Sequence, residues 1–255
     1  MVPTTADDAA RRVDFVIGGA QKGGTTALDR LLRLHPDVAM ASVKEPKWFD
    51  DDRRFAHGAP PCSGYHALFG RAPAVRLRGE ATPTYCWWPA AAERIRDYHP
   101  GMKWILLFRD PASRAYSQWN MRRADGSERQ SFARAADAEV ERGADVAVRN
   151  NLGTSYLSRG FYARQVERLL GLFPREQLLL LRSEWLRDDP SRTLRQVHAF
   201  LGIDPMDVAR PVEAHVGAYA EPMDAATRSR LVRLFEADIR RLEALTGWDL
   251  ADWLS

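Results

Sequence analysis

A glycine-rich segment near the start of the chain has the composition of an anion-binding loop. It lies between an apolar run at 13–17 and a helical repeat of leucines, and it reads Gly18-Gly19-Ala20-Gln21-Lys22-Gly23-Gly24-Thr25-Thr26. Glycines let a backbone turn sharply, and the start of a helix offers free N–H groups and a positive dipole end to an anion. Lys22 adds a mobile charge, and Thr25 and Thr26 add hydroxyl donors. The segment predicts a phosphate-binding turn from strand to helix.

The spacing of this loop differs from two common phosphate loops. The kinase-type pattern GxxxxGK[ST] needs a lysine directly after its second glycine. Here Lys22 precedes Gly23 and Gly24. The dinucleotide pattern GxGxxG is also absent. A tight turn with a solvated lysine is the structural alternative.

A second candidate anion site lies in the segment 106–117, which reads Leu-Leu-Phe-Arg-Asp-Pro-Ala-Ser-Arg-Ala-Tyr-Ser. Arg109 closes an apolar run, at the carboxyl edge where open α/β sheets bind ligands. Ser117 follows about two helical turns later. An arginine fork with a hydroxyl can clamp a phosphate. The alternative is a surface pair of Arg109 with Asp110 and a neutral helix serine.

The stretch from Gly19 to Leu28 resembles the 5′-phosphosulfate loop of PAPS-dependent sulfotransferases, especially the sulfotransferase domain of heparan sulfate-modifying enzymes and their bacterial relatives. The resemblance implies that the chain moves a sulfuryl group from PAPS (3′-phosphoadenosine-5′-phosphosulfate) to an acceptor, without a metal, and leaves PAP. It also implies a role for Lys22 at the bridging oxygen between phosphate and sulfate. The other nucleotide-binding residues that it implies are Gln21, Gly23, Gly24, Thr25, Thr26, Arg109, Ser117 and Tyr162, the last from a GxY segment at 160–162.

The segment 44–50, Lys-Glu-Pro-Lys-Trp-Phe-Asp, supplies a candidate base. Sulfuryl transfer is an in-line displacement that needs a base for the acceptor proton and a cation at the leaving oxygen. The matching segment of heparan-type enzymes carries the base on its glutamate, which implies Glu45. Their 3-O-sulfating branch also uses the positions of Lys47 and Asp50, and the first is histidine there. An exposed charged turn over two buried aromatics is the alternative.

A further resemblance covers the segment 80–85, Glu-Ala-Thr-Pro-Thr-Tyr. Heparan-type enzymes often have a lysine where Ala81 stands, so their acceptor specificity does not transfer simply. The candidate acceptor-binding residues are Lys44, Lys47, Asp50, Thr82, Tyr85 and Trp88, and core packing is an equal alternative for the aromatic ones. His66 is a reserve base, because cytosolic aryl sulfotransferases use histidine.

Composition limits the remaining function classes. The formal charge of +3 comes without a Lys/Arg run or interleaved aromatics, so we expect no nucleic-acid partner. No run reaches the roughly 18 apolar residues of a membrane span, and the N-terminus lacks a signal-peptide core, which favours the cytoplasm. Cys62 and Cys86 are not in a CxxC pair, so we expect reduced thiols and no zinc site, although one bridge stays open.

The apolar patterns predict one α/β domain at 13–255 after a polar tail at 1–12. The predicted fold is a P-loop-type three-layer α/β/α sandwich with a mainly parallel sheet. Expected strands cover 13–17, 103–108, 177–181 and, more weakly, 74–77, with strand-like residues at 38–40. Expected helices cover about 28–35, 111–122, 161–172, 191–201 and 224–245. The polar segment 122–152 is expected to be helical, mobile or both.

Several questions stay open in the sequence. The family usually closes over its nucleotide with a late Lys-Gly-Arg-type element, and His215-Val216-Gly217-Ala218-Tyr219 stands in that region without a basic residue. A P-loop kinase that uses ATP and magnesium, with Asp110 as its metal ligand, is the second hypothesis. A non-catalytic nucleotide-binding protein is the third. We expect the acceptor group to be a hydroxyl or amine of a sugar, a glycolipid or a small natural product, while the identity of the acceptor and the oligomeric state are not predicted.

Overall fold

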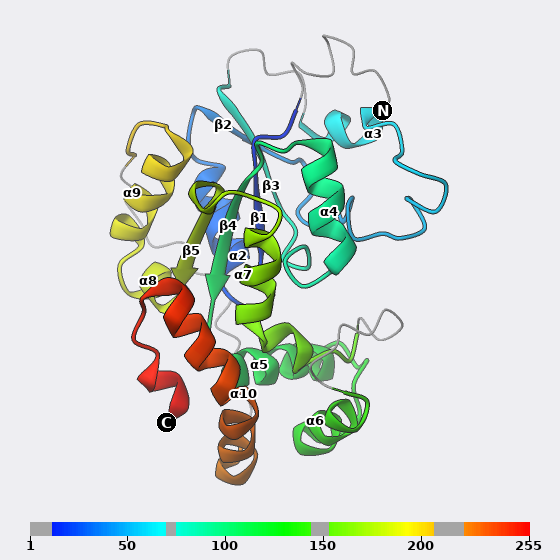
Figure 1. Cartoon of the computed structure of the whole chain (residues 1–255), viewed down its shortest axis with the longest axis vertical. Coiled ribbons are helices and arrows are strands. Elements are labelled where there is room, and N and C mark those ends of the chain that lie inside the picture. Colours follow the sequence, from blue (N-terminus) through cyan, green and yellow to red (C-terminus); the bar gives the residue numbers. More distant parts are fainter. Residues whose placement is uncertain (1–11, 70–74, 144–152, 207–221) are drawn as a thin grey trace.

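The computed structural model describes residues 12–69, 75–143, 153–206 and 222–255, and these residues form a five-stranded parallel sheet (Figure 1). The strand order is β2-β3-β1-β4-β5, with β1 in the centre and every neighbouring pair parallel. This confirms the predicted α/β fold with a parallel sheet. The strands are β1 (Phe15–Gly19), β2 (Val38–Met40), β3 (Leu77–Ala81), β4 (Lys103–Phe108) and β5 (Leu178–Arg182).

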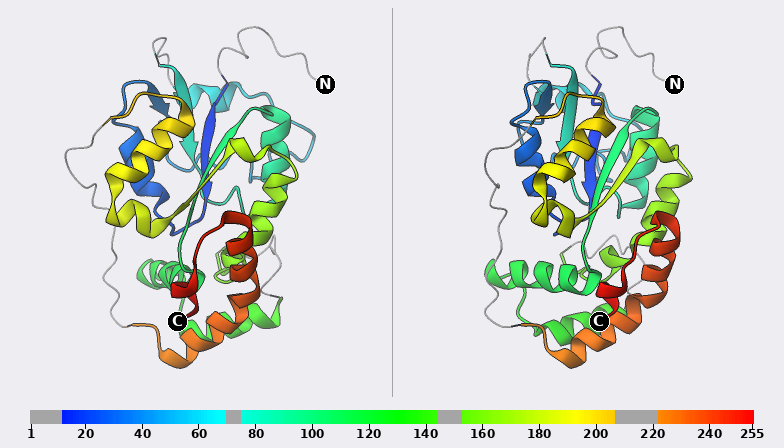
Figure 2. Two further views of the ribbon diagram at one scale, coloured as in Figure 1. Left: turned by 60° about the vertical axis from the view of Figure 1, so that its left-hand side comes forward. Right: turned by 90° about the vertical axis from the view of Figure 1, so that its left-hand side faces the viewer.

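Helices cover both faces of the sheet, as the views in Figure 2 show. Phe15 and Ile17 face one apolar cluster, together with α2, α8 and α9, while Val16 faces the other, with α4 and α7. This alternation follows from the two-residue repeat of a strand. The helices named here are α2 (Thr25–Leu32), α4 (Pro89–Tyr98), α7 (Tyr162–Leu170), α8 (Ser183–Asp188) and α9 (Pro190–Leu201).

The remaining elements extend the structure beyond the carboxyl ends of the strands. Figures 1 and 2 show α5, α6 and part of α10 on that side of the sheet. The bounds are α3 (Ser63–His66), α5 (Pro111–Ala124), α6 (Phe132–Glu141) and α10 (Ala225–Thr246), with short 3₁₀ turns at η1 (Ala67–Phe69), η2 (Ser158–Gly160), η3 (Arg175–Gln177) and η4 (Ala251–Leu254).

Helix ends follow the local signals that the sequence carries. Asp110 caps α5 by accepting bonds from the amides of Ala112 and Ser113 at 3.3 and 3.1 Å, with Pro111 in the first turn. Gly202 and Gly247 end α9 and α10 in the left-handed conformation. The predicted start of α5 and the predicted ends of α9 and α10 are therefore confirmed.

The strand predicted at 74–77 is placed too early: residues 75 and 76 precede β3, which begins at Leu77 and continues to Ala81, and residue 74 lies outside the described residues. Its sequence, Leu-Arg-Gly-Glu-Ala, contains no β-branched or aromatic residue and has glycine at its centre, so its strand propensity is low. Gly79 leaves room for the Phe15 ring, since a Cβ there would come within 2.1 Å of it. Glu80 is fully buried, which is rare for a charged side chain. Both positions are explained by tertiary contacts that a local pattern does not contain.

The polar segment, the two cysteines and the predicted tail were also subjects of sequence-based predictions. The polar segment 122–152 contains α6, which begins after the capping residue Ser131. Cys62 and Cys86 are both free thiols. The predicted tail, except Arg12, and the late segment 215–219 lie outside the described residues. None of the helices among the described residues has the length and hydropathy of a membrane span.

Candidate active site

Three loops meet at the carboxyl edge of the sheet, around the central strand β1. The amide of Ala20 donates to the carbonyl of Leu107 on β4 at 2.9 Å, and the amide of Cys86 donates to Gly18 on β1 at 2.9 Å. The amide of Glu45 donates to Ala81 on β3 at 3.0 Å. These backbone bonds place the loops after β1, β2 and β3 beside one another. The crevice at the carboxyl ends of such a sheet is where open α/β folds bind ligands.

The glycine-rich turn after β1 packs closely against β4. A Cβ added at Gly23 would lie 2.2 Å from the carbonyl oxygen of Leu107, so only glycine fits. Gly24 precedes α2 in the left-handed conformation, with φ of 102°. No side chain of a described residue caps this helix, and the first amides of any α-helix have no partner within it. The amides of Thr25 and Thr26 are therefore placed to bind an anion.

Lys22 lies in the same turn and is half-buried. Its φ of 69° is left-handed, an uncommon conformation for a residue with a Cβ. Its Nζ lies 3.9 Å from Sδ of Met121 on α5. The turn thus directs the ammonium group toward the space between β1 and α5.

Two buried arginines lie behind the turn. Arg159 donates from Nη1 to Oε1 of Gln21 at 2.5 Å, and its guanidinium lies 4.4 Å from the centre of the Trp87 ring. Arg114 donates to the carbonyl of Gln21 at 3.4 Å and to Oε1 of Gln118 at 2.9 Å. Burial, then the neighbouring charge of Arg114, lowers the pKa of Arg159 to about 10, and burial also lowers the pKa of Arg114. Both stay charged at neutral pH and make the floor of the turn positive.

Arg109 and Ser117, the predicted second anion site, lie at the end of β4 and in α5. Within the described part of the chain, the Arg109 guanidinium makes no hydrogen bond or ion pair with a carboxylate. Tyr162 is fully buried, and its hydroxyl donates to the carbonyl of Arg109 at 2.9 Å. Its ring stacks on Phe108 with 4.5 Å between the ring centres. Tyr162 therefore fixes the backbone from which Arg109 projects.

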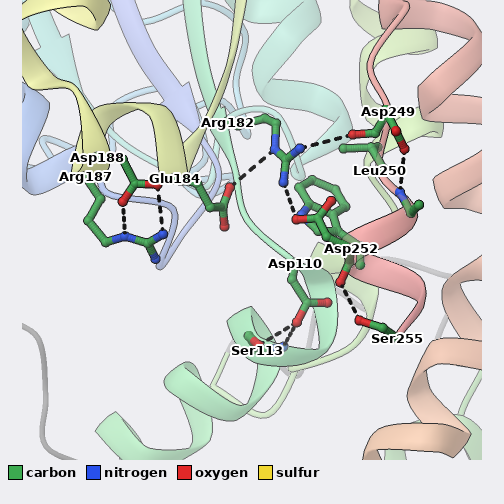
Figure 3. Close-up of polar contacts among 12 residues, drawn as sticks. Asp110, Ser113, Arg182, Glu184, Arg187, Asp188, Asp249, Leu250, Asp252 and Ser255 are labelled. Atoms are coloured by element: carbon green, nitrogen blue, oxygen red, sulfur yellow. Dashed lines mark hydrogen bonds and ion pairs between the residues drawn. The ribbon is translucent and has the colours of Figure 1, made fainter.

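Asp110, the candidate metal ligand of the kinase hypothesis, is engaged in structural contacts. Its carboxylate caps α5, accepts a bond from the hydroxyl of Ser113 at 2.5 Å and forms an ion pair with Arg228 of α10. Figure 3 shows Asp110 and Ser113 at the start of α5, near the group around Arg182 at the end of β5. The carboxylate thus caps α5 and connects it to α10 through Arg228.

The segment 44–50, which we call the base loop, carries its candidate base between two lysines. Oε1 of Glu45 lies 2.8 Å from Nζ of Lys44, and Oε2 lies 3.8 Å from Nζ of Lys47. The Glu45 side chain is 31% exposed, so it is open to an acceptor. Glu45 and Lys47 both have left-handed φ values, of 59° and 51°. Such conformations in residues other than glycine persist only where surrounding contacts hold them.

The segment 80–85 supplies those contacts. Thr84 donates from Oγ1 to Oδ2 of Asp50 at 2.5 Å, and the amide of Trp48 donates to the hydroxyl of Tyr85 at 3.0 Å. Burial raises the pKa of Asp50, in spite of the bond from Thr84. Trp88 is buried, and its Nε1 donates to Oδ1 of Asp52 at 3.1 Å. Thr82 and Tyr85 are buried as well, so these candidate acceptor residues lie beneath the base loop.

Three residues at the site were not singled out from the sequence, namely Glu80, Arg114 and Arg159. Each stands inside or next to a motif, in the segments 80–85, 106–117 and 160–162, but its own type gives no sign of burial. Arg114 and Arg159 are 0% and 4% exposed, and charged side chains are rarely so buried. Their position beside motif residues was the one feature of the sequence that could have placed them at the site.

The chain is similar to one family of known proteins. A family model described as a sulfotransferase domain matches residues 12–217. The chain is 33% identical over 190 residues to heparan sulfate glucosamine 3-O-sulfotransferase 3B1 of Mus musculus, covering 74% of this chain and 45% of that protein. The chain spans about half the length of the curated relatives it matches.

Solved structures give the same result. A sulfotransferase from Alicyclobacillus acidocaldarius has a TM-score of 0.82 and 31% identity, over 96% of this chain and 99% of that chain. A mouse sulfotransferase complexed with PAP has a TM-score of 0.51 and 20% identity, over 76% of this chain and 60% of that chain, which is a likeness of fold.

Proposed function

The chain belongs to the sulfotransferase domain family, and from that premise we propose that it transfers a sulfuryl group from PAPS to an acceptor hydroxyl or amine. The observation that carries the proposal is the meeting of two loops at one edge of the sheet. The end of β1, which leads into the turn that holds Lys22, and the base loop that holds Glu45 both contact the segment between β3 and α4, through the Cys86 amide to Gly18 and the Trp48 amide to Tyr85. A cation for a leaving oxygen and a carboxylate for an acceptor proton are thus carried by loops at the same edge of the sheet.

The residues of the turn fit the 5′ end of PAPS. Gly23 lets the turn pack directly on β4, Gly24 leads into α2 in the left-handed conformation, and the first amides of α2 are left without a side-chain cap. Arg109, which has no carboxylate partner among the described residues, and Ser117 would hold the 3′-phosphate. PAPS supplies the activated sulfuryl group when it is bound. Gln21, held by Arg159, fixes the shape of the turn.

Glu45 is proposed as the base that takes the acceptor proton. Its bonds to Lys44 and Lys47 orient the carboxylate, and its partial exposure gives an acceptor access. Lys22 is proposed to stabilise the negative charge that develops on the leaving oxygen. Positioning and electrostatics account for most of the catalysis in the related transfer of phosphoryl groups, and the same logic applies here.

The acceptor is proposed to be a hydroxyl or amine of a sugar, a glycolipid or a small natural product. The curated relatives are named for glucosamine 3-O-sulfation of heparan sulfate. This chain has Lys47 and Ala81 where the resemblance expects a histidine and a lysine. Since both positions lie on the acceptor side, we propose an acceptor other than heparan sulfate.

Thermal unfolding with excess PAP tests the proposal, in parallel with ADP and with ATP plus magnesium. A ligand at about 100 times its Kd stabilises the native state by roughly 2.7 kcal/mol, or roughly 5–10 °C in Tm for a chain of this size. A rise with PAP, followed by turnover of PAPS on a panel of acceptors, is the expected result. A rise only with ATP and magnesium would favour the kinase hypothesis. PAP binding without transfer to any acceptor would favour a binding protein.

A further inference from the structure

Glu80 is a fully buried carboxylate surrounded by hydroxyl groups. Its Oε1 accepts bonds from the hydroxyls of Tyr65 and Tyr85 at 3.0 and 2.7 Å. Its Oε2 accepts a bond from the hydroxyl of Thr82 at 2.6 Å. The side chain has no exposed surface, so it cannot touch an acceptor or a nucleotide. Burial of a carboxylate destabilises the folded state unless hydrogen bonds compensate for the lost hydration. The three hydroxyls provide these bonds.

Two of the three hydroxyls also accept bonds from the base loop. The Tyr85 hydroxyl accepts from the amide of Trp48 at 3.0 Å and, at 3.5 Å, from that of Phe49. The Thr82 hydroxyl accepts from the amide of Lys47 at 3.5 Å. A hydroxyl that donates its proton to a carboxylate keeps its lone pairs for an amide. The carboxylate therefore sets the direction of both hydroxyls, and these face the loop as acceptors.

We propose that Glu80 is a positioning residue for the base, because it holds the base loop in its reactive shape through the hydroxyls of Tyr85 and Thr82. The inference rests on the proposed function of Glu45. Glu45 and Lys47 have left-handed backbones, and the amides of Lys47, Trp48 and Phe49 donate the bonds to these hydroxyls. Loss of the relay would let the loop relax and move the Glu45 carboxylate away from an acceptor.

Tyr65 provides a matched control within the same cluster. Its hydroxyl donates to the same oxygen of Glu80 as the Tyr85 hydroxyl does, and both phenols are fully buried. Of these two phenols, only that of Tyr85 accepts bonds from amides of the base loop among the described residues. Tyr65→Phe and Tyr85→Phe thus remove the same group from the same carboxylate, and they differ in the relay alone.

The charges around Glu80 give the relay a pH dependence. Burial, with a smaller contribution from Asp50 of the base loop, raises the pKa of Glu80 to about 7, against the bonds from Thr82, Tyr85 and Tyr65. Burial and the charge of Glu80 raise the pKa of both phenols well above the usual value, so they remain donors. As the pH falls through 7, Glu80 gains a proton and loses acceptor capacity, and the relay weakens.

The decisive experiment compares hydrogen exchange and kinetics in the full chain. In Tyr85→Phe we expect the amides of residues 47–49 to exchange at least tenfold faster and kcat to fall at least tenfold, while the KM for PAPS and the Kd for PAP change less than twofold. Tyr65→Phe should leave all four within twofold. Glu80→Gln should behave as Tyr85→Phe does. The variant that combines Glu80→Gln with Tyr85→Phe should show no larger loss of kcat than either single variant. The fall of kcat below pH 7 should be absent from Glu80→Gln and from Tyr85→Phe.

Equal effects of Tyr65→Phe and Tyr85→Phe on exchange in the base loop would overturn the inference, because the cluster would then act only as core packing. Exchange is measured without substrate, so it tests the relay even if the wild-type chain shows no PAPS turnover. Faster exchange in Tyr85→Phe without any turnover in the wild type would uphold the relay and reject the proposed function.

Discussion

The guanidinium of Arg159 donates to the side-chain carbonyl of Gln21, which joins the 3₁₀ turn η2 to the glycine-rich turn after β1. The two residues are 138 positions apart in the sequence. Arg159 is almost fully buried and lies over the face of Trp87, which follows β3. One side chain thus connects the candidate nucleotide loop with the segment that supports the base loop.

Replacement of Arg159 by lysine should weaken PAP binding. Lysine lacks the planar fork that can bond Gln21 and stack on Trp87 at once. We expect the Kd for PAP, measured by calorimetry, to rise about tenfold, which corresponds to about 1.4 kcal/mol. Arg164→Lys is the control, because Arg164 also lies over an aromatic ring, that of Phe161 at 4.6 Å. Equal losses in the two variants would mean that stacking alone, and not the contact with Gln21, matters.

Replacement of Gly23 by alanine should damage the same site through the backbone. The added Cβ would lie 2.2 Å from the Leu107 carbonyl, so the turn must move away from β4. We expect a loss of about 2–3 kcal/mol in the free energy of unfolding, measured in urea, and at least tenfold weaker PAP binding. Gly171→Ala, whose Cβ would have its nearest neighbour at 3.5 Å, should change both by little. Unchanged PAP binding in Gly23→Ala would exclude this turn as the nucleotide site.

Replacement of Lys22 by alanine should separate catalysis from binding. Without the ammonium group the leaving oxygen loses its stabilising charge, and kcat should fall at least 100-fold. The Kd for PAP should rise less than tenfold, since the amides of α2 and Arg109 remain. Lys103→Met is a control at the far end of β4, where Lys103 bonds to the carbonyls of Phe200 and Leu201. It should lower Tm without changing kcat, and a kcat near wild type in Lys22→Ala would reject the role.

Stability should depend on pH through Glu80, in the opposite direction to activity. Its pKa is about 7 in the folded chain, against 4.5 ordinarily, so the folded state keeps a proton that the unfolded state has released. This contribution is complete below pH 4.5 and is lost as the pH rises through 7. The fall in the free energy of unfolding between pH 4.5 and 7.5 should be larger in the wild type than in Glu80→Gln, by on the order of 3 kcal/mol. Parallel pH curves for the two proteins would contradict the buried titration.

The loops of the candidate site could be located from the sequence because their signals are local. The glycines before Thr25 and the Asp110-Pro111 pair specify a turn and a helix start within a few residues. The burial of Glu80 could not be predicted in the same way. Its environment consists of Tyr65, Tyr85 and Thr82, and only the packing of α3 and the following loop against β3 brings the phenol of Tyr65 to it.

The sequence by itself predicted most strands and helices in their order along the chain, the glycine-rich turn and, through the family resemblance, the roles proposed for Lys22 and Glu45. Strands, helices and turns leave local patterns of apolar, polar and glycine residues, so they can be predicted from short stretches of sequence. Only the tertiary structure decided three contacts. Gln21 accepts a hydrogen bond from Arg159, Asp110 forms an ion pair with Arg228, and the Tyr85 hydroxyl accepts a bond from the base loop. These contacts join residues far apart in the chain, and they form because the parallel strands bring their carboxyl ends to one edge.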